Sequence, residues 1–271
     1  MCLLFALVLP VYGLKTYTDY TSQPEFSRLI LYLLLCLQTL STCCLEMHFF
    51  ILCYIIYQKI QLINDDLSML KVDTIIRNNY PFLSHSGDRY ITTNFNYSGF
   101  KLNGMSKACF VRYLRIKYYI IGKAVKNLNN VFGIQLGIFL CTLWLMALFD
   151  LYYDLTRGNH PDSDNIFISK LILYGWILQY TTRFILITLI AHITTKEAYK
   201  TKVLITDINN RFLDPGTKEE LQLFFNQISS NSMEFTACDF FTLNTHLITS
   251  AIAAGTTYLV ILLQFNSSNK Q

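Results

Sequence analysis

The chain has 271 residues, of which 52% are hydrophobic and only 15% are charged, and its formal net charge is +4. Soluble domains carry roughly 25% charged residues, so the composition disfavours a soluble fold and favours a membrane protein. The small positive charge requires no nucleic acid, because the basic residues cluster at the predicted membrane edges and are matched by acidic residues elsewhere.

Four apolar windows are long enough to cross a bilayer as helices, which takes about 20 mainly apolar residues. They cover residues 28–57, 131–153, 166–193 and 240–265. The opening run, residues 1–11, is apolar but too short to cross alone. It lacks the basic residue that normally precedes the core of a secretory signal, so the end of an earlier span is favoured. We predict an all-α polytopic transmembrane bundle with four full spans and a short N-terminal remnant.

Lys and Arg predict the orientation, because they are retained on the cytoplasmic side of short loops. The segment after the first full span is rich in them: Lys59, Lys71, Arg77, Arg89, Lys101, Lys107, Arg112, Arg115, Lys117, Lys123 and Lys126. The segment after the second span has Arg157 against three Asp residues. This alternation predicts five regions: 1–57, a cytoplasmic 58–130, two spans in 131–193, a cytoplasmic 194–239, and 240–271 with an external C-terminus.

The two cytoplasmic regions have local signals of their own. Apolar residues keep helical spacing over residues 60–76, many Asn, Ser and Gly residues predict a loop over 78–107, and a basic helix follows from Ala108. Further on, Thr217 and Glu220 have capping-box spacing before a short amphipathic helix, residues 218–227.

The last span has one small or polar stripe when it is drawn at 100° per residue. Its members are His246, Ser250, Ala253, Thr257, Ile261 and Gln264. Such a face suits either the lining of a pore, where ions meet water and hydrogen-bonding groups, or close packing between helices. The residues alone leave both interpretations open.

Three segments resemble insect gustatory receptors of the seven-helix insect chemoreceptor superfamily: residues 114–133, residues 235–243, and Thr257-Tyr258 followed by five aliphatic residues and Gln264-Phe265. The resemblance implies a ligand-gated, non-selective cation channel in the plasma membrane with an external C-terminus. It also implies a homo- or hetero-tetramer with other gustatory receptors, held by the short helix near residue 218. The four spans would match family helices four to seven, so helices one and two would be absent, as in an incomplete gene model or a truncated natural product.

The same resemblance favours the pore interpretation of the last span. It implies that Thr257, Tyr258 and Ile261 belong to the pore helix and that Gln264 and Phe265 form its gate. The expected partners are a small tastant as ligand and membrane lipid around the helices. An odorant-receptor-like channel and a helical carrier without a pore are the alternatives, although no inverted repeat favours a carrier.

Aromatic and polar side chains at the outer ends of the second and third spans suit a small organic ligand. The candidates are Trp144, Asp150, Tyr152, Tyr153, Tyr174, Trp176 and Gln179. Because Trp and Tyr also anchor helices at membrane interfaces, each has a structural alternative.

Glu46 and Arg183 are the charges deepest in the predicted spans. A lone charge at that depth costs roughly 2.5–3.5 kcal/mol on insertion scales, so we expect them to pair, unless each faces a water-filled cavity. No nucleophile arrangement, phosphate loop, carboxylate pair or metal-ligand spacing favours catalysis. We therefore expect no enzyme, no cofactor and no bound metal.

Overall fold

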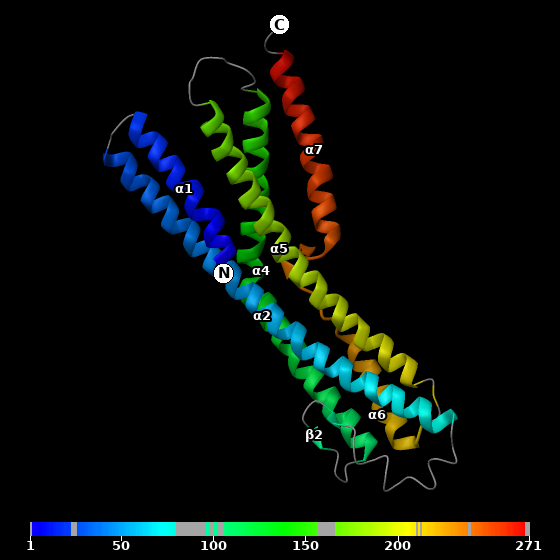
Figure 1. Cartoon of the computed structure of the whole chain (residues 1–271). Coiled ribbons are helices and arrows are strands. Elements are labelled where there is room, and N and C mark those ends of the chain that lie inside the picture. The colour runs from blue at the N-terminus through cyan, green and yellow to red at the C-terminus, as the bar shows by residue number, and fades with distance from the viewer. Residues whose placement is uncertain are drawn as a thin grey trace. The chain divides into compact units, whose positions relative to one another are not determined.

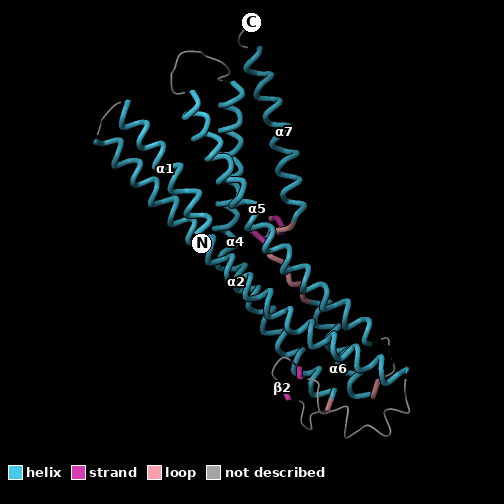
Figure 2. Tube along the Cα trace, in the orientation of Figure 1, coloured by secondary structure: helices cyan, strands magenta, loops and turns pink. Residues whose placement is uncertain are grey.

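The protein is described by a computed structural model, which covers residues 2–22, 26–79, 96–97, 100–101, 106–156, 166–209, 211, 213–237 and 240–268. Its main elements are helices: α1 (Cys2–Ser22), α2 (Phe26–Asn79), α4 (Lys107–Thr156), α5 (Ile166–Asn209), α6 (Pro215–Ser230) and α7 (Thr245–Ser268) (Figure 1). Two short antiparallel hairpins complete them, β1 (Asn96–Tyr97) with β2 (Phe100–Lys101) and β3 (Thr236–Ala237) with β4 (Phe241–Thr242) (Figure 2).

Four of the described helices are long and apolar enough to cross a membrane: Leu29–Ile76, Lys107–Thr156, Phe167–Asn209 and Thr245–Ser268. Each coincides with most of one predicted window, so the predicted all-helical membrane bundle is confirmed. The last helix begins at Thr245 rather than at residue 240, because Phe241–Thr242 form strand β4. The three longer helices continue well beyond bilayer thickness, because helical segments follow the spans of α2 and α5 and precede the span of α4. The predicted loop over residues 78–107 lies mostly outside the described residues and includes the hairpin of β1 and β2.

The N-terminal helix is longer than the apolar run predicted. It passes through Pro10 and continues to Ser22, whereas the apolar run ends at Val11. Its middle packs on other helices: Val11 lies against Gly175 of α5, and the Tyr12 hydroxyl lies 2.6 Å from Thr39 Oγ1 of α2. Tertiary contacts of this kind stabilise helices that hydrophobic periodicity alone does not mark.

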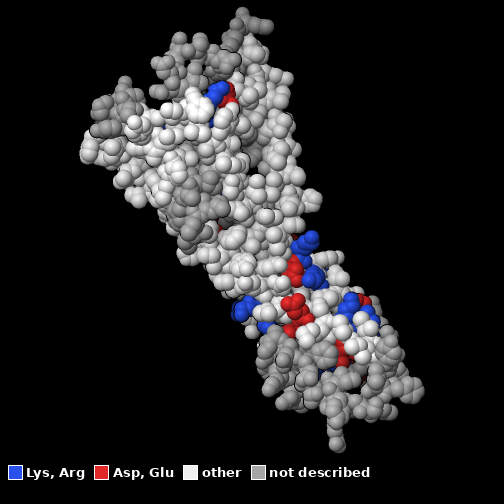
Figure 3. Space-filling model, viewed as in Figure 1, with Lys and Arg blue, Asp and Glu red and all other residues white. Residues whose placement is uncertain are grey.

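The chain divides into two compact units, and α2, α4 and α5 contribute one part to each. Unit 1 comprises residues 1–51, 131–190 and 236–271, and unit 2 comprises residues 52–130 and 191–235. On the face that Figure 3 shows, the described surface of unit 1 is almost free of charged residues apart from a small group near the ends of α4 and α5. A surface of this composition is typical of helices that face lipid.

Unit 2 has a conventional apolar core with a charged periphery. Its core is built from α2, α4, α5 and α6 by Ile60, Ile63, Leu67, Phe110, Leu114, Ile205, Ile208, Leu221 and Phe224. Both ends of the buried Asn64 side chain on α2 have hydrogen-bond partners. Its amide nitrogen donates to the Glu197 carboxylate over 2.7 Å, and its carbonyl oxygen accepts from Thr201. Ion pairs at the edge join α2 to α5 through Lys71 and Asp207, and α4 to α6 through Arg115 and Glu220.

Helix α6 is capped differently from the prediction. It begins at Pro215 rather than at 218, and its N-cap is Asp214, whose carboxylate accepts from the Thr217 amide over 2.9 Å. Thr217 is buried within the first turn, and Glu220 pairs with Arg115 instead of closing a capping box. Proline at the first helical position fits this frame, because its missing N–H is one that the helix leaves unpaired anyway.

Replacing Asp214 by Ala is expected to destabilise the start of α6 by about 0.5–2 kcal/mol. Partial burial raises the pKa of Asp214, but the hydrogen bonds from Thr217 outweigh it and leave the pKa below its ordinary value. The cap therefore stabilises the helix above about pH 3.9 and is lost as the pH falls through the lowered pKa. Hydrogen exchange of the peptide containing Thr217 should accelerate in Asp214→Ala and change little in Asp214→Asn; equal protection in all three proteins would contradict the assignment.

Candidate functional site

Helix α7 contacts the rest of unit 1 along one narrow face, and bulky apolar residues such as Ile252 and Phe265 are exposed on it together with the predicted stripe. The six residues of the predicted stripe, His246, Ser250, Ala253, Thr257, Ile261 and Gln264, are all exposed, whereas Gly255 is buried. At 100° per residue the stripe centres roughly 180° from Gly255. Helix α7 therefore turns its small and polar face away from the rest of unit 1.

The buried face of α7 packs on α4 around one tryptophan. The Trp144 indole N–H donates to the Ala251 carbonyl oxygen over 3.0 Å, and the ring meets Tyr258 edge-on with centroids 6.4 Å apart. A Cβ added to Gly255 would lie 3.0 Å from Leu148 Cδ2 and 3.7 Å from Trp144 Nε1. We call Trp144 and Leu148 of α4 with Ala251, Gly255 and Tyr258 of α7 the α4–α7 seam.

The predicted gate residues are distributed over both faces of α7. Thr257, Ile261 and Gln264 lie on the exposed stripe, and Tyr258 is turned toward Trp144. Phe265 is 67% exposed near the end of the helix. Trp144 itself, predicted for the ligand pocket, has its indole N–H engaged by the α7 backbone, and sequence reasoning had no signal for this partner.

Two of the remaining predicted pocket residues, Trp176 and Gln179, lie one turn apart on α5, and Trp176 contacts α1. The Trp176 ring contacts Tyr12 of α1 edge-on, with centroids 4.5 Å apart, and stacks on Tyr180 at 5.8 Å. Gln179 is fully buried, and neither its amide nitrogen nor its carbonyl oxygen has a hydrogen-bond partner among the described residues. Buried polar atoms are almost always paired, so this side chain is unusual.

Asp150 of α4 lies close enough to Tyr180 of this group to interact with it electrostatically, whereas Tyr174 and Tyr153 are about half exposed. Tyr174 is half exposed and donates to the Asp154 carboxylate over 3.0 Å, which ties the end of α4 to the start of α5. Tyr153 is also largely exposed, and Asp150 is partly buried on α4. Sequence reasoning missed Tyr12 and Tyr180. Tyr180 follows Gln179 directly and was identifiable, whereas Tyr12 lies beyond the apolar run that was taken to end at Val11.

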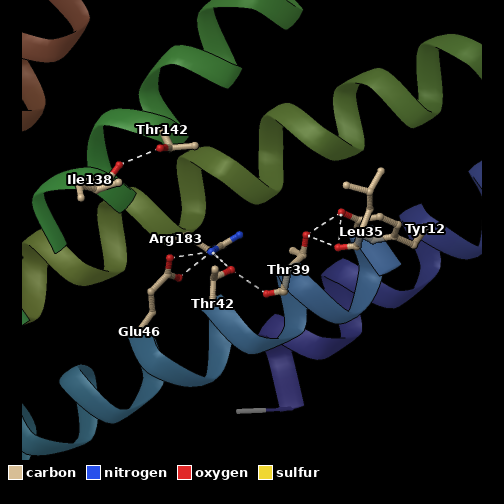
Figure 4. A network of polar contacts seen from close by, with 8 residues as sticks. All are labelled: Tyr12, Leu35, Thr39, Thr42, Glu46, Ile138, Thr142 and Arg183. Carbon is tan, nitrogen blue, oxygen red and sulfur yellow. Dashed lines mark hydrogen bonds and ion pairs between the residues drawn. The ribbon is translucent and has the colours of Figure 1, made fainter. Parts of the chain in front are cut away.

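Glu46 of α2 and Arg183 of α5 form a buried, two-pronged ion pair (Figure 4). Arg183 Nη2 lies 2.6 Å from Glu46 Oε1, and Nε lies 2.8 Å from Oε2. A third bond runs from Nη2 to Thr42 Oγ1, one turn before Glu46, at 3.2 Å. Two parallel N–H···O bonds give the strongest geometry available to these groups, and side-chain exposures of 5% and 2% place them in the interior.

Gln179 lies one helical turn before Arg183 on the same face of α5. The side chains of α1, α2 and α5 in this part of unit 1 therefore comprise a satisfied ion pair, the hydroxyl pair of Tyr12 and Thr39, the unsatisfied amide of Gln179, and the contacting rings of Tyr12, Trp176 and Tyr180. This combination is suited to holding a small molecule with hydroxyl groups. Within the described residues, no three or more His, Cys, Asp or Glu side chains cluster as a metal site would require.

Comparisons with known proteins agree with these features. A sequence model of a family described as "7tm Chemosensory receptor" matches residues 1–269. The chain is 28% identical over 164 residues to the Drosophila melanogaster protein "Gustatory receptor for sugar taste 43a", a match that covers 60% of this chain and 38% of that protein. It is 27% identical over 156 residues to "Putative gustatory receptor 28b" of the same species, covering 56% of this chain and 33% of that protein.

The matched part of the chain thus spans little more than a third of either relative. The family match, by contrast, extends over nearly all of the 271 residues. Together with four helices that are long and apolar enough to span a bilayer, it identifies a multi-pass membrane protein. The chain belongs to the 7tm chemosensory receptor family, with gustatory receptors among its relatives.

Proposed function

We propose that the chain is a gustatory receptor subunit, a ligand-gated non-selective cation channel in which α7 lines the pore and a small tastant opens it. The observation that carries the proposal is the exposed small and polar stripe of α7, opposite the α4–α7 seam. Hydroxyl and amide side chains facing lipid are costly, whereas the same side chains are expected at the axis of a water-filled pore.

The exposed stripe of α7 also supports assembly of several subunits around this helix. Only 6% of the apolar window of α7 is buried within the chain, against 39% for α5. A ring of copies of this helix, one from each of four subunits, would bring the stripes together around an axis. Either four copies of this chain or a mixture with other gustatory receptors satisfies this geometry.

In this proposal Gln264 and Phe265 form the gate near the C-terminal end of α7. An apolar ring of Phe265 side chains closes a narrow pore by expelling water, and exposing Gln264 in its place rewets the pore. The excess of basic residues over residues 58–128 supports a cytoplasmic unit 2, so that the gate and the C-terminus lie on the external side.

The ligand site that we propose is centred on Gln179 with Trp176 and Tyr180 of α5 and Tyr12 of α1. Its amide offers two donors and one acceptor that have no partner among the described residues. Aromatic faces beside such a group suit the apolar faces and hydroxyl groups of a sugar or similar polyol. A relative named for sugar taste supports the same ligand class.

The proposal is tested by recording cation currents from cells that express the chain while a panel of sugars is applied. Extracellular labelling of a C-terminal tag measures delivery and tests the orientation. We expect a sugar-evoked current whose size or selectivity changes in Gln264→Ala, because that substitution removes the polar group at the gate.

A chimera completes the design, because the matched relatives are longer than this chain. It joins residues 107–271 to the preceding part of the Drosophila sugar-taste receptor and is recorded in parallel. Current in the chimera alone would show that α4 to α7 supply the pore and that the preceding segment is also needed. Delivered protein without current in both forms, over the whole panel, would contradict the proposed function.

A further inference from the structure

The α4–α7 seam contains a polar contact of unusual kind. The carbonyl oxygen of Ala251 lies within α7, where such an oxygen already accepts from the amide four residues later, and Trp144 Nε1 adds a second bond to it over 3.0 Å. Among the described residues, this is the only hydrogen bond that joins α7 to another long helix.

The seam is also tightly packed. Gly255 leaves no room for a Cβ without moving Leu148, and Tyr258 lies one turn beyond it against the Trp144 ring. Ala251, Gly255 and Tyr258 are spaced by four and three residues, so they form one ridge of the helix. Contact on this ridge fixes the rotation of α7 about its own axis.

The opposite face of α7 carries the exposed stripe that ends at Gln264. Because a helix turns as a rigid body, any rotation that changes which side chains the stripe presents must also move the ridge past Trp144. The hydrogen bond is directional, with donor and acceptor held at 3.0 Å, so a rotation of a few tens of degrees breaks it.

We propose that Trp144 is a positioning residue for α7, and that its bond to Ala251 is made in one gating state of the helix and broken in the other. This inference rests on the proposed function. It differs from the assignment of Trp144 to the ligand pocket, since the indole acts on the helix backbone and touches no ligand. Its loss changes the balance between the two states rather than the affinity of the ligand site.

The first test compares Trp144→Phe with the unchanged chain. Phenylalanine keeps an aromatic ring and loses the N–H donor. Hydrogen bonds between membrane helices average about 0.6 kcal/mol and reach about 1.7 kcal/mol, so the half-activating sugar concentration and the ligand-free current should shift by about three- to eighteenfold. Gly255→Ala places a methyl group 3.0 Å from Leu148 Cδ2, so it alters the packing of the same seam and should also shift both quantities. Leu145→Ala, at an exposed position next to Trp144, should leave both unchanged.

The second test needs no current. Thr257→Cys, on the exposed stripe, is treated with a charged methanethiosulfonate, and its rate of modification is measured with Trp144 or Phe at position 144. The unsubstituted chain provides the background from its native cysteines. A change of at least about threefold is expected, because the bond sets the rotation of α7.

The outcomes separate the inference from the proposed function. No sugar-evoked current in any form, with a modification rate that depends on position 144, would overturn the channel and retain the positioning role. Shifts of less than twofold at equal surface delivery, or an unchanged modification rate, would overturn the inference. If Trp144→Phe is not delivered, Gly255→Ala decides it by the same two measurements.

Discussion

Replacing Glu46 by Gln while Arg183 remains is expected to abolish most surface delivery of the protein. The substitution leaves a guanidinium that is only 5% exposed without its counter-ion, and breaking a buried pair from one side typically costs about 3–5 kcal/mol. Arg183→Gln should be similarly damaging, because it strands the carboxylate. The measurement is the fraction of protein labelled at the cell surface, together with the thermal midpoint of the protein in detergent.

Two double variants make the test specific. Exchanging the charges, Glu46→Arg with Arg183→Glu, should restore part of the lost delivery, and a double variant that is delivered no better than either single reversal would contradict the pairing. Glu46→Leu with Arg183→Met removes both charges at once. Because well-packed apolar residues often replace buried pairs without loss, this variant should be delivered well. If it also conducts normally, the pair serves folding alone.

The pair was predictable from the sequence, whereas the hydroxyl beside it was not. A charge within an apolar span has few ways to be satisfied, so Glu46 and Arg183 were natural partners once both spans were recognised. Thr42 contacts the same guanidinium over 3.2 Å, but threonine is common in membrane helices and bonds to its own backbone just as readily. The identity of a third partner depends on helix rotation, which composition does not determine.

The extent of the helices was also predictable only in part. Hydropathy located the four spans because each satisfies a length requirement set by the bilayer. It failed at α1, where Lys15 and Asp19 interrupt the apolar run although the helix continues to Ser22. Capping-box spacing likewise selected Thr217 rather than Asp214 as the N-cap of α6. Both residue types are acceptable N-caps, and only Pro215, which favours the first helical position, distinguishes them. Tertiary packing determines the length of α1, and the bond from the Thr217 backbone N–H to Asp214 determines where α6 begins.

Trp144 and Gln179 show the limit for site prediction. Both were ligand candidates by residue type and position, yet Trp144 is engaged by the α7 backbone, whereas Gln179 is buried without a partner among the described residues. No pattern in the sequence separates these two situations. What separates them is the neighbour across the helix interface, which for Trp144 is a carbonyl of a helix more than a hundred residues away.

Gln179→Leu is expected to change stability and tastant response in opposite directions. A buried amide without partners costs about 1–3 kcal/mol, so an apolar side chain of similar size should raise the thermal midpoint of the purified protein. If Gln179 binds the hydroxyl groups of a sugar, the same variant should lose the sugar response, because a site built to hydrogen-bond a hydroxyl loses discrimination and affinity when that partner is removed. Surface labelling would show delivery unchanged or increased.

The opposite signs separate the ligand role from a structural one. A residue that only packs would lower stability and response together when it is changed. Gln179→Glu gives a second comparison: it keeps acceptor oxygens but introduces a charge one turn from Arg183, where it would compete with Glu46 for the guanidinium. We expect that variant to weaken the sugar response and to lower the thermal midpoint as well. Unchanged half-activating sugar concentrations in Gln179→Leu would remove Gln179 from the ligand site and leave its burial without a functional explanation.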